Sequence, residues 1–579
     1  MTTSDHRLSR RSFLAASAGA AAACVAGWLP AFEVPASAQS TIPAPPEFPV
    51  GIRLYQQAFE NWSEEISLEK AWTCAPASAA DVVTLANWAY AHGYEIRARG
   101  KMHAWSPLTI PVGSNGAGII LADTTQSLTA VVIDSASTPA TVTAQTGITM
   151  DRLLQDLEDA GLGLTAHPAP GDVTLGGILA VDGHGAAIPA VGESRSPGHT
   201  YGSISNLILS LRAVVWNGDT GRYELRSFAR NDPAIQPFLT HLGRTFVTDV
   251  TLQVGANSRM RCQSFTHIPV SELFGPQGSG PRTFATFLEQ TGRVEAIWYP
   301  FNDTPWLKVW SLAPTKPAAS RAVSEPYNYT FADVIPQPAS DLAREILTGN
   351  GKVTPDFAQV EYTASAVGLE ATVSADIWGW AKNVLLYVKP STLRFTANGY
   401  AVLTSRDQVQ STIHEFTSAL AWLLSAYQAE GAFPLNGPVE IRVTGLDTPL
   451  DVDVPGARSP QLSALRPRPD HPEWDVAVWF DVLTMPGTPK ASEAYRGIEQ
   501  WLFTNFDGPT AMVRPEWSKG WAYSTTAAWS DPAMLSKSIP DALRAGQADG
   551  DDWDSALAAL AAADPHRVFT NGFLNAFLT

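Results

Sequence analysis

The stretch Arg99-Gly100-Lys101-Met102-His103 and, further along the chain, residues 168–185 (PAPGDVTLGGILAVDGHG) decide how this protein folds. The first stretch ends a strand-like run, residues 94–99, which follows a helical pattern in residues 81–92. The second is too rich in glycine for a regular helix and too apolar for a solvated linker. Because glycine has no Cβ, the backbone of this second segment is expected to approach another group closely.

Short strands and helices alternate around these segments, which predicts an α+β fold. An amphipathic helix is expected at residues 150–160, with Thr149 as N-cap and Gly161 as its stop. Near the C-terminus, residues 541–564 predict a surface helix. Further strands are expected at residues 118–122, 141–145, 206–216, 246–254, 295–300, 439–443 and 476–482.

The N-terminus has the features of an export signal. Residues 9–14 (SRRSFL) precede an alanine-rich apolar run, and residues 35–38 (PASA) offer small side chains to a signal peptidase. The apolar run is short for a transmembrane anchor. Twin-arginine signals export proteins already folded in the cytoplasm, which suits a protein that loads a large cofactor. We expect residues 1–38 to be removed and the protein to be secreted or periplasmic.

Length and composition narrow the class of protein. At 579 residues, two domains are expected. A net charge of -17 argues against nucleic acid as a partner. Of three cysteines, Cys24 leaves with the signal, whereas Cys74 and Cys262 remain and could pair only if the fold brings them together. The histidines lack metal-ligand spacing, so no metal site is predicted.

Common catalytic motifs are missing from the sequence. Residues 161–166 match a loose G-x-G-x-x-A pattern, but they end a helix where a Rossmann site would join a strand to one. Residues 349–353 lack the spacing and the hydroxyl of a P-loop. The sequence contains neither a G-x-S-x-G nor an H-E-x-x-H motif, so hydrolase and metalloenzyme functions are not favoured.

The glycine-rich segments resemble the vanillyl-alcohol-oxidase type of FAD-binding domain. The resemblance continues through residues 76–83, 199–205 and 246–251. In that family the two segments wrap the FAD pyrophosphate, and the loop histidine bonds to the flavin. The resemblance implies FAD linked covalently through His103, although Ala104 follows where the family often has serine. Residues implied to bind FAD are Arg99, Gly100, Lys101, Met102, His103, Thr174, Gly176, Gly177, Asp182, Gly183, His184, Gly185, Tyr201, Gly202 and Val250.

The second half resembles the aldonolactone-oxidase and alditol-oxidase branch of this family. The similar segments are residues 294–300, 440–442, 480–484 and 514–521. Together with the export signal and a tryptophan-rich lobe, they resemble the bacterial cholesterol oxidases with covalently bound FAD. The resemblance implies a two-domain fold whose FAD domain uses both ends of the chain and whose cap domain has a large antiparallel sheet. The implied parts are residues 45–258 (FAD), 259–530 (substrate cap) and 531–579 (return to the FAD domain).

Five charged residues are candidates for catalysis. Arg442 is the first choice, and Lys519 the second, for a cation that stabilises negative charge on the substrate oxygen. Glu440 lies two residues from Arg442 on a predicted strand, so the two share a face, either at a site or as an exposed ion pair. Glu295 is the candidate base, or else a structural strand residue, and Asp481 could lie in the same pocket.

The resemblance implies an FAD-dependent oxidase. It would take hydride from the 3β-hydroxyl carbon of a sterol, reduce O2 to H2O2 and shift the Δ5 double bond to Δ4. An alditol or aldonolactone oxidase is the alternative, and an exported binding module without flavin is a rival from another class. No stable membrane span is expected, while transient contact with a lipid surface and the oligomeric state stay open.

Overall fold

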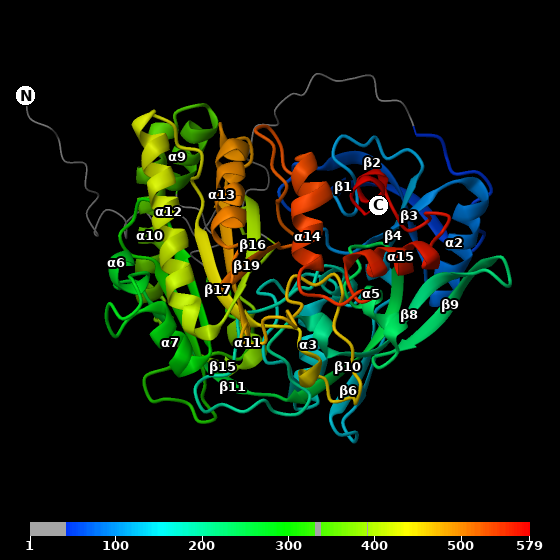
Figure 1. Ribbon diagram of the computed structural model, residues 1–579, viewed down its shortest axis with the longest axis horizontal. Helices are drawn as coiled ribbons and strands as arrows, with labels where there is room; N and C mark the ends of the chain where they lie inside the picture. Colours follow the sequence, from blue (N-terminus) through cyan, green and yellow to red (C-terminus); the bar gives the residue numbers. More distant parts are fainter. Residues whose placement is uncertain (1–41, 330–336, 391, 579) are drawn as a thin grey trace, which may run out of the picture.

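The computed structural model describes residues 42–329, 337–390 and 392–578, which form two lobes (Figure 1). The predicted export signal lies outside the described residues. No helix in the described ranges has both the length and the apolar character needed to cross a bilayer. Cys74 and Cys262 are both buried and free, so the fold does not pair them.

The first lobe contains two sheets. One has the order β1-β2-β4-β3, with β4 parallel to both β2 and β3. The other has the order β5-β6-β10-β8-β9, and β7 pairs with β10. Their strands are β1 Arg53–Glu60, β2 Ser67–Ala75, β3 Glu95–Arg99, β4 Ile119–Asp123, β5 Val131–Asp134, β6 Ala140–Gln145, β7 Leu162–Gly163, β8 Ile208–Asn217, β9 Arg222–Ala229 and β10 Phe246–Ala256. The lobe's helices are α2 Ala79–His92, α3 Met150–Asp159, α4 Leu175–Ala180 and α5 Gln236–Leu239.

Helix α4 corrects one expectation, because the glycine-rich run at residues 168–185 was not expected to hold a regular helix. Thr174 caps this six-residue helix, and its hydroxyl accepts from the Gly177 N–H at 3.3 Å. Leu175 and Ile178 are buried. The cap and this burial offset the poor helix propensity of glycine.

The second lobe is built on one nine-stranded sheet, which is antiparallel apart from β14 and β15. Its order is β14-β15-β11-β13-β12-β17-β18-β16-β19. The strands are β11 Arg259–Phe265, β12 Arg293–Trp298, β13 Trp306–Leu312, β14 Arg321–Ala322, β15 Asp376–Trp380, β16 Thr396–Thr404, β17 Val439–Gly445, β18 Val476–Thr484 and β19 Ala511–Pro515. The helices are α6 Val270–Leu273, α7 Phe284–Thr291, α9 Gln337–Leu347, α10 Thr354–Ala371, α11 Ala381–Leu385, α12 Val409–Ala429 and α13 Ala491–Asn505.

The large sheet has one apolar face and one face with charged side chains. Ile441 of β17 belongs to the apolar core. In this core Phe416 of α12 stacks on Phe480 of β18, with 3.9 Å between the ring centroids. Because side chains alternate along a strand, Glu440 and Arg442 point to the opposite face. That face meets the first lobe and forms part of a cavity between the two.

The C-terminal segment packs on the first lobe (red in Figure 1). The buried Asp564 accepts hydrogen bonds from the Tyr223 hydroxyl at 2.5 Å and from Arg244 at 2.9 Å. Val568 and Phe569 join the core of the first lobe. The helices here are α14 Ile539–Arg544, α15 Trp553–Ala563 and α16 Gly572–Phe577. The surface helix expected at residues 541–564 is thus two helices, and the Trp553 side chain is buried because it packs against α16.

Candidate active site

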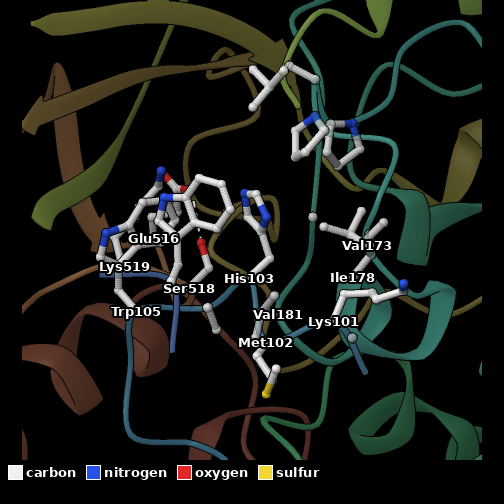
Figure 2. A pocket seen from close by; sticks show the side chains of 18 of the residues that line it. Lys101, Met102, His103, Trp105, Val173, Ile178, Val181, Glu516, Ser518 and Lys519 are labelled. Atoms are coloured by element: carbon white, nitrogen blue, oxygen red, sulfur yellow. Dashed lines mark hydrogen bonds between the residues drawn. The ribbon is translucent and has the colours of Figure 1, made fainter. Parts of the chain in front are cut away.

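A cavity of about 480 Å³ lies between the lobes. The loop from Arg97 to Trp105 and the start of α4 form its wall in the first lobe, and β12, β17 and the segment after β19 contribute from the second. Figure 2 shows Glu516, Ser518 and Lys519 gathered on one side of His103, and Val173 and Ile178 on the other. Side chains far apart in the sequence therefore meet in one space.

His103 points into this cavity with a neutral imidazole ring (Figure 2). Burial, together with the charges of Lys519 and Arg394, lowers the pKa of His103 to about 3. The ring lies against Trp62, with 3.8 Å between ring centroids. A neutral imidazole has a nitrogen lone pair available for a bond to carbon, which suits a covalent anchor.

The loop around His103 has free backbone donors. From Lys101 to Ala104, no N–H group donates to a backbone acceptor within the described ranges. The preceding Gly100 packs against the Thr174 side chain so closely that a Cβ at this position would collide with it. Met102 has a positive φ of 57°, which turns the loop. Successive free N–H groups in such a turn suit the oxygens of a diphosphate.

The two lobes are joined directly beside His103. The Trp105 N–H donates to the Ser518 carbonyl oxygen at 2.8 Å, and the Ser106 N–H donates to the same oxygen at 3.2 Å. The Lys519 ammonium lies 3.8 Å from the centroid of the Trp105 ring, within the range of a cation–π contact. The position of Lys519 is therefore tied to the loop that contains His103.

A row of charges crosses the strands beside the cavity. Glu295 of β12 lies opposite Lys308 of β13 on one side and opposite Arg442 of β17 on the other. Arg442 donates to Glu295 at 3.3 Å, to Glu440 at 3.0 Å and also to Asp481 of β18. Burial alone would lower the pKa of Arg442, but these carboxylates raise it well above the usual value. Arg442 therefore keeps its positive charge inside the protein.

Lys308 ends this row inside an aromatic enclosure. Its ammonium lies 2.9 Å from the Tyr387 ring centroid and 4.0 Å from a Glu295 oxygen. Burial lowers the pKa of Lys308 to about 8, while the Glu295 carboxylate opposes the shift. The Tyr387 hydroxyl donates to Glu295, so this carboxylate has a partner on each side.

Comparison with known proteins decides the family. A family model described as cholesterol oxidase, substrate-binding, matches residues 259–579, and an FAD binding domain model matches residues 71–223. A solved structure named solvent-stable cholesterol oxidase is 56% identical, with a TM-score of 0.92 over 93% of this chain and 100% of its own. The chain belongs to the cholesterol oxidase family. It binds FAD in the first lobe, and the predicted two-domain α+β fold is confirmed.

Other comparisons agree with membership of the cholesterol oxidase family. The crystal structure of cholesterol oxidase from B. sterolicum is 48% identical, with a TM-score of 0.91 and the same coverage of 93% and 100%. A chitooligosaccharide oxidase shares the fold alone, at 12% identity and a TM-score of 0.52 over 88% of this chain and 93% of its own. Among curated proteins no relative was found.

The cholesterol oxidase fold brings most of the predicted site residues to one cavity, although their roles stay predictions. Those on its wall are Arg99, Gly100, Lys101, Met102, His103, Thr174, Gly176, Gly177, Gly183, His184, Glu440, Arg442 and Lys519. Glu295 and Asp481 lie behind Arg442 and are at most 1% exposed, so neither forms part of the wall.

The remaining predicted FAD contacts also lie away from the wall. Asp182 accepts hydrogen bonds from the Ala464 N–H and the Ser463 hydroxyl. The Tyr201 hydroxyl donates to Glu193 at 3.0 Å. Three others pack against protein atoms beyond the cavity, namely Gly185, Gly202 and Val250.

Sequence reasoning missed several residues of this cholesterol oxidase site. The Trp62 ring lies against His103, the Tyr387 hydroxyl donates to Glu295, and Glu516 lies on the cavity wall. Glu516 lies within residues 514–521, so its proximity to Lys519 was a usable signal. Trp62 and Tyr387 belong to segments without a recognisable motif, and only the fold places them here.

Proposed function

We propose that this protein is an FAD-dependent sterol oxidase that converts a 3β-hydroxyl group to a ketone and reduces O2 to H2O2. Isomerisation of a Δ5 to a Δ4 double bond completes the proposed reaction. The observation that carries the proposal is the 56% identity to a cholesterol oxidase over 93% of the chain. The cavity beside His103 is where the substrate would meet the cofactor.

The wall of the cavity in the second lobe suits a large apolar substrate. It is mostly aromatic or aliphatic around a few polar groups, as is typical of sites for such ligands. The apolar side chains are Ile297, Trp306, Tyr329, Phe357, Leu393, Phe395 and Leu483. A small polyol would make few contacts with these apolar side chains, so a sterol is favoured as substrate over an alditol or a lactone.

The residues of the first lobe fit FAD. The free N–H groups from Lys101 to Ala104 would hold the pyrophosphate, and the neutral His103 ring would supply the proposed covalent link. When bound, FAD supplies hydride acceptance and the return of electrons to O2. The protein must orient the alcohol, exclude water and handle the hydroxyl proton.

Two cations are placed to act on the substrate oxygen. Lys519 and Arg442 both lie on the cavity wall. Loss of hydride from an alcohol builds negative charge on its oxygen, and a fixed positive charge stabilises that state. We assign this role to Lys519 and Arg442 together. Glu440 lies beside Arg442 and orients its guanidinium at 3.0 Å.

Substrate tests decide between the sterol and the sugar-alcohol functions. Cholesterol is expected to yield H2O2 and a conjugated ketone, whereas xylitol and gulonolactone yield no peroxide, because a small polar substrate leaves the apolar wall unfilled. Peroxide is measured in a coupled assay and the conjugated ketone by its ultraviolet absorbance. Turnover of xylitol or gulonolactone without turnover of cholesterol would overturn the proposal.

We also propose export by the twin-arginine pathway, which rests on residues 9–14. Replacing Arg10 and Arg11 with lysine is expected to keep the enzyme in the cytoplasm with its flavin bound, because the receptor reads the arginine pair. Cell fractionation with a peroxide assay measures this. Arg7→Lys, just before the motif, is the matched control and should be exported normally. Equal export of the double variant would contradict the pathway.

A further inference from the structure

Two carboxyl groups beside the cavity each have a buried oxygen without a donor. Asp481 is 0% exposed, and its Oδ2 accepts from Arg442, but its Oδ1 has no hydrogen-bond donor within the described ranges. The Oε1 of Glu516 accepts from the Ser518 hydroxyl at 3.2 Å, and its Oε2 likewise has no donor there. Buried acceptors without donors are costly, so this arrangement calls for a proton.

The two oxygens face the same point above Gly399 of β16. A Cβ built on Gly399 would lie 2.6 Å from the Asp481 Oδ1 and 2.9 Å from the Glu516 Oε2. Gly399 lies opposite Asp481 in the sheet, and its carbonyl oxygen accepts from the Glu516 N–H at 2.9 Å. A glycine inside a strand marks a close approach, and here it lets the two carboxyl groups reach hydrogen-bonding contact.

The surrounding charges favour one proton on this pair. The charged groups around Asp481 and Glu516 come from the neighbouring strands and from the segment of Glu516 itself. Glu295 belongs to β12, Glu440 and Arg442 belong to β17, and Lys519 lies three residues after Glu516. Lys308 lies beyond Glu295, so this row of side chains contains three cations and four carboxyl groups. One proton shared by Asp481 and Glu516 makes the positive and negative charges of the row equal in number.

Two titratable groups of the first lobe, His184 and Asp182, interact electrostatically with this row. Burial, together with the charge of Arg442, lowers the pKa of His184 to about 3, so the ring is neutral. Burial and the charge of Asp447 raise the pKa of Asp182 well above its usual value, which disfavours a negative charge at this position. Burial and the Glu516 carboxylate raise the pKa of Asp481 to about 7, against the lowering effect of Arg442 and Lys519.

We propose that Asp481 and Glu516 share one proton, and that Glu516 accepts the hydroxyl proton of the substrate. The inference rests on the proposed sterol oxidation. Glu516 lies on the cavity wall and Asp481 behind it, so Glu516 is the member that reaches substrate and Asp481 is a positioning residue. Forming the ketone breaks the O–H bond, and the proton passes to the carboxylate oxygen of Glu516. FAD, when bound, would accept the hydride from the carbon that carries the hydroxyl group, and O2 is the final oxidant.

The sign of the pH dependence follows from the pair. While Asp481 holds its proton, it donates to Glu516 and weakens this carboxylate as a base. Loss of that proton from Asp481 as pH rises through about 7 removes this donor and leaves the Glu516 oxygen open to the substrate proton, so kcat/KM for cholesterol is expected to rise with an inflection near this pH. Asp481→Asn resembles the protonated state at every pH. This variant should therefore lack the inflection in kcat/KM and should have, at every pH, the activity that the wild type has below the inflection.

Infrared spectroscopy of the resting holoenzyme tests the shared proton without substrate. Wild type should show a protonated-carboxyl band that shifts with isotopically labelled aspartate, disappears as pH rises through about 7 and is absent in Asp481→Asn. Gly399→Ala, whose Cβ would separate the pair, should also remove the band. A wild-type spectrum without this band, or its persistence in Asp481→Asn, overturns the shared proton, whatever the outcome of the sterol assay.

Kinetics test the role of Glu516. Glu516→Gln should lower kcat by roughly 10²-fold or more at every pH, the typical loss for a general base. Glu499→Gln is the matched control: burial also raises the pKa of Glu499 to about 7, but this residue bonds to Tyr400 at 2.7 Å and is not part of the cavity wall. Glu499→Gln should keep the inflection in kcat/KM that the wild type shows. Full activity of Glu516→Gln would overturn the assignment, and an inflection that persists in Asp481→Asn would exclude the pair as its origin.

Discussion

Replacing His103 with alanine is expected to leave the acid-precipitated protein colourless, while the wild-type precipitate stays yellow. The His103 ring faces the cavity and burial holds its pKa at about 3, so a ring nitrogen is free to bond to the flavin. Without that ring, FAD would be held by the backbone donors of the loop alone, and acid would release it. Absorbance of the redissolved precipitate measures the effect.

His184 provides the comparison for this experiment. It also lies on the cavity wall with a neutral ring, but it stacks on Trp479 with 3.8 Å between ring centroids. His184→Ala should keep the flavin in the precipitate. Colour that persists in His103→Ala and disappears in His184→Ala would move the covalent link to His184, and colour retained in both variants would exclude a link through either histidine.

Replacing Arg442 with methionine is expected to produce the largest combined loss of activity and stability. The change removes the cation that Glu295, Glu440 and Asp481 share and leaves their charges unbalanced inside the protein. Breaking a buried pair in this way costs about 3–5 kcal/mol of unfolding free energy. Loss of a group that stabilises charge in the transition state lowers kcat by roughly 10²–10³-fold. Urea unfolding and peroxide production measure the two effects.

Arg514 separates a catalytic loss from a structural one. It is also buried in the second lobe, but it donates to the carbonyl oxygens of Ala464, Arg466 and Ala542 and is not part of the cavity wall. Arg514→Met should lower stability while the folded fraction keeps its kcat. If Arg442→Met lowers kcat no more than Arg514→Met does, Arg442 has only a structural role.

The sequence predicted the strands beside the site because their side chains alternate. Residues 439–443 and 476–482 lie within β17 and β18, and Glu440 and Arg442 share the face that the alternation predicted. Helix α4 was not expected, because glycine counts against a helix and the contribution of the Thr174 cap depends on the fold. The local sequence pattern was therefore sufficient to predict these strands, but it was not sufficient to predict a short helix that depends on its cap.

The site was only partly predictable for a physical reason. The loop at residues 99–103 is a contiguous motif, whereas the contact between Asp481 and Glu516 depends on the pairing of β16 with both β18 and β19. Likewise, sequence alone could not tell that Glu295 lies behind Arg442. The roles assigned to these residues, and the domain limits at residues 258 and 530, stay predictions.

The carboxylate of Asp564 has a consequence for how this enzyme is made. Tyr223 and Arg244 of the first lobe donate to a residue that leaves the ribosome after the whole second lobe. Domains that fold during synthesis usually mature from the N-terminus onward, but this one is completed by a segment translated after the whole second lobe. The lobe that binds FAD is therefore assembled only after the second lobe has been translated, and a nascent chain halted within the second lobe would carry an unfinished cofactor site.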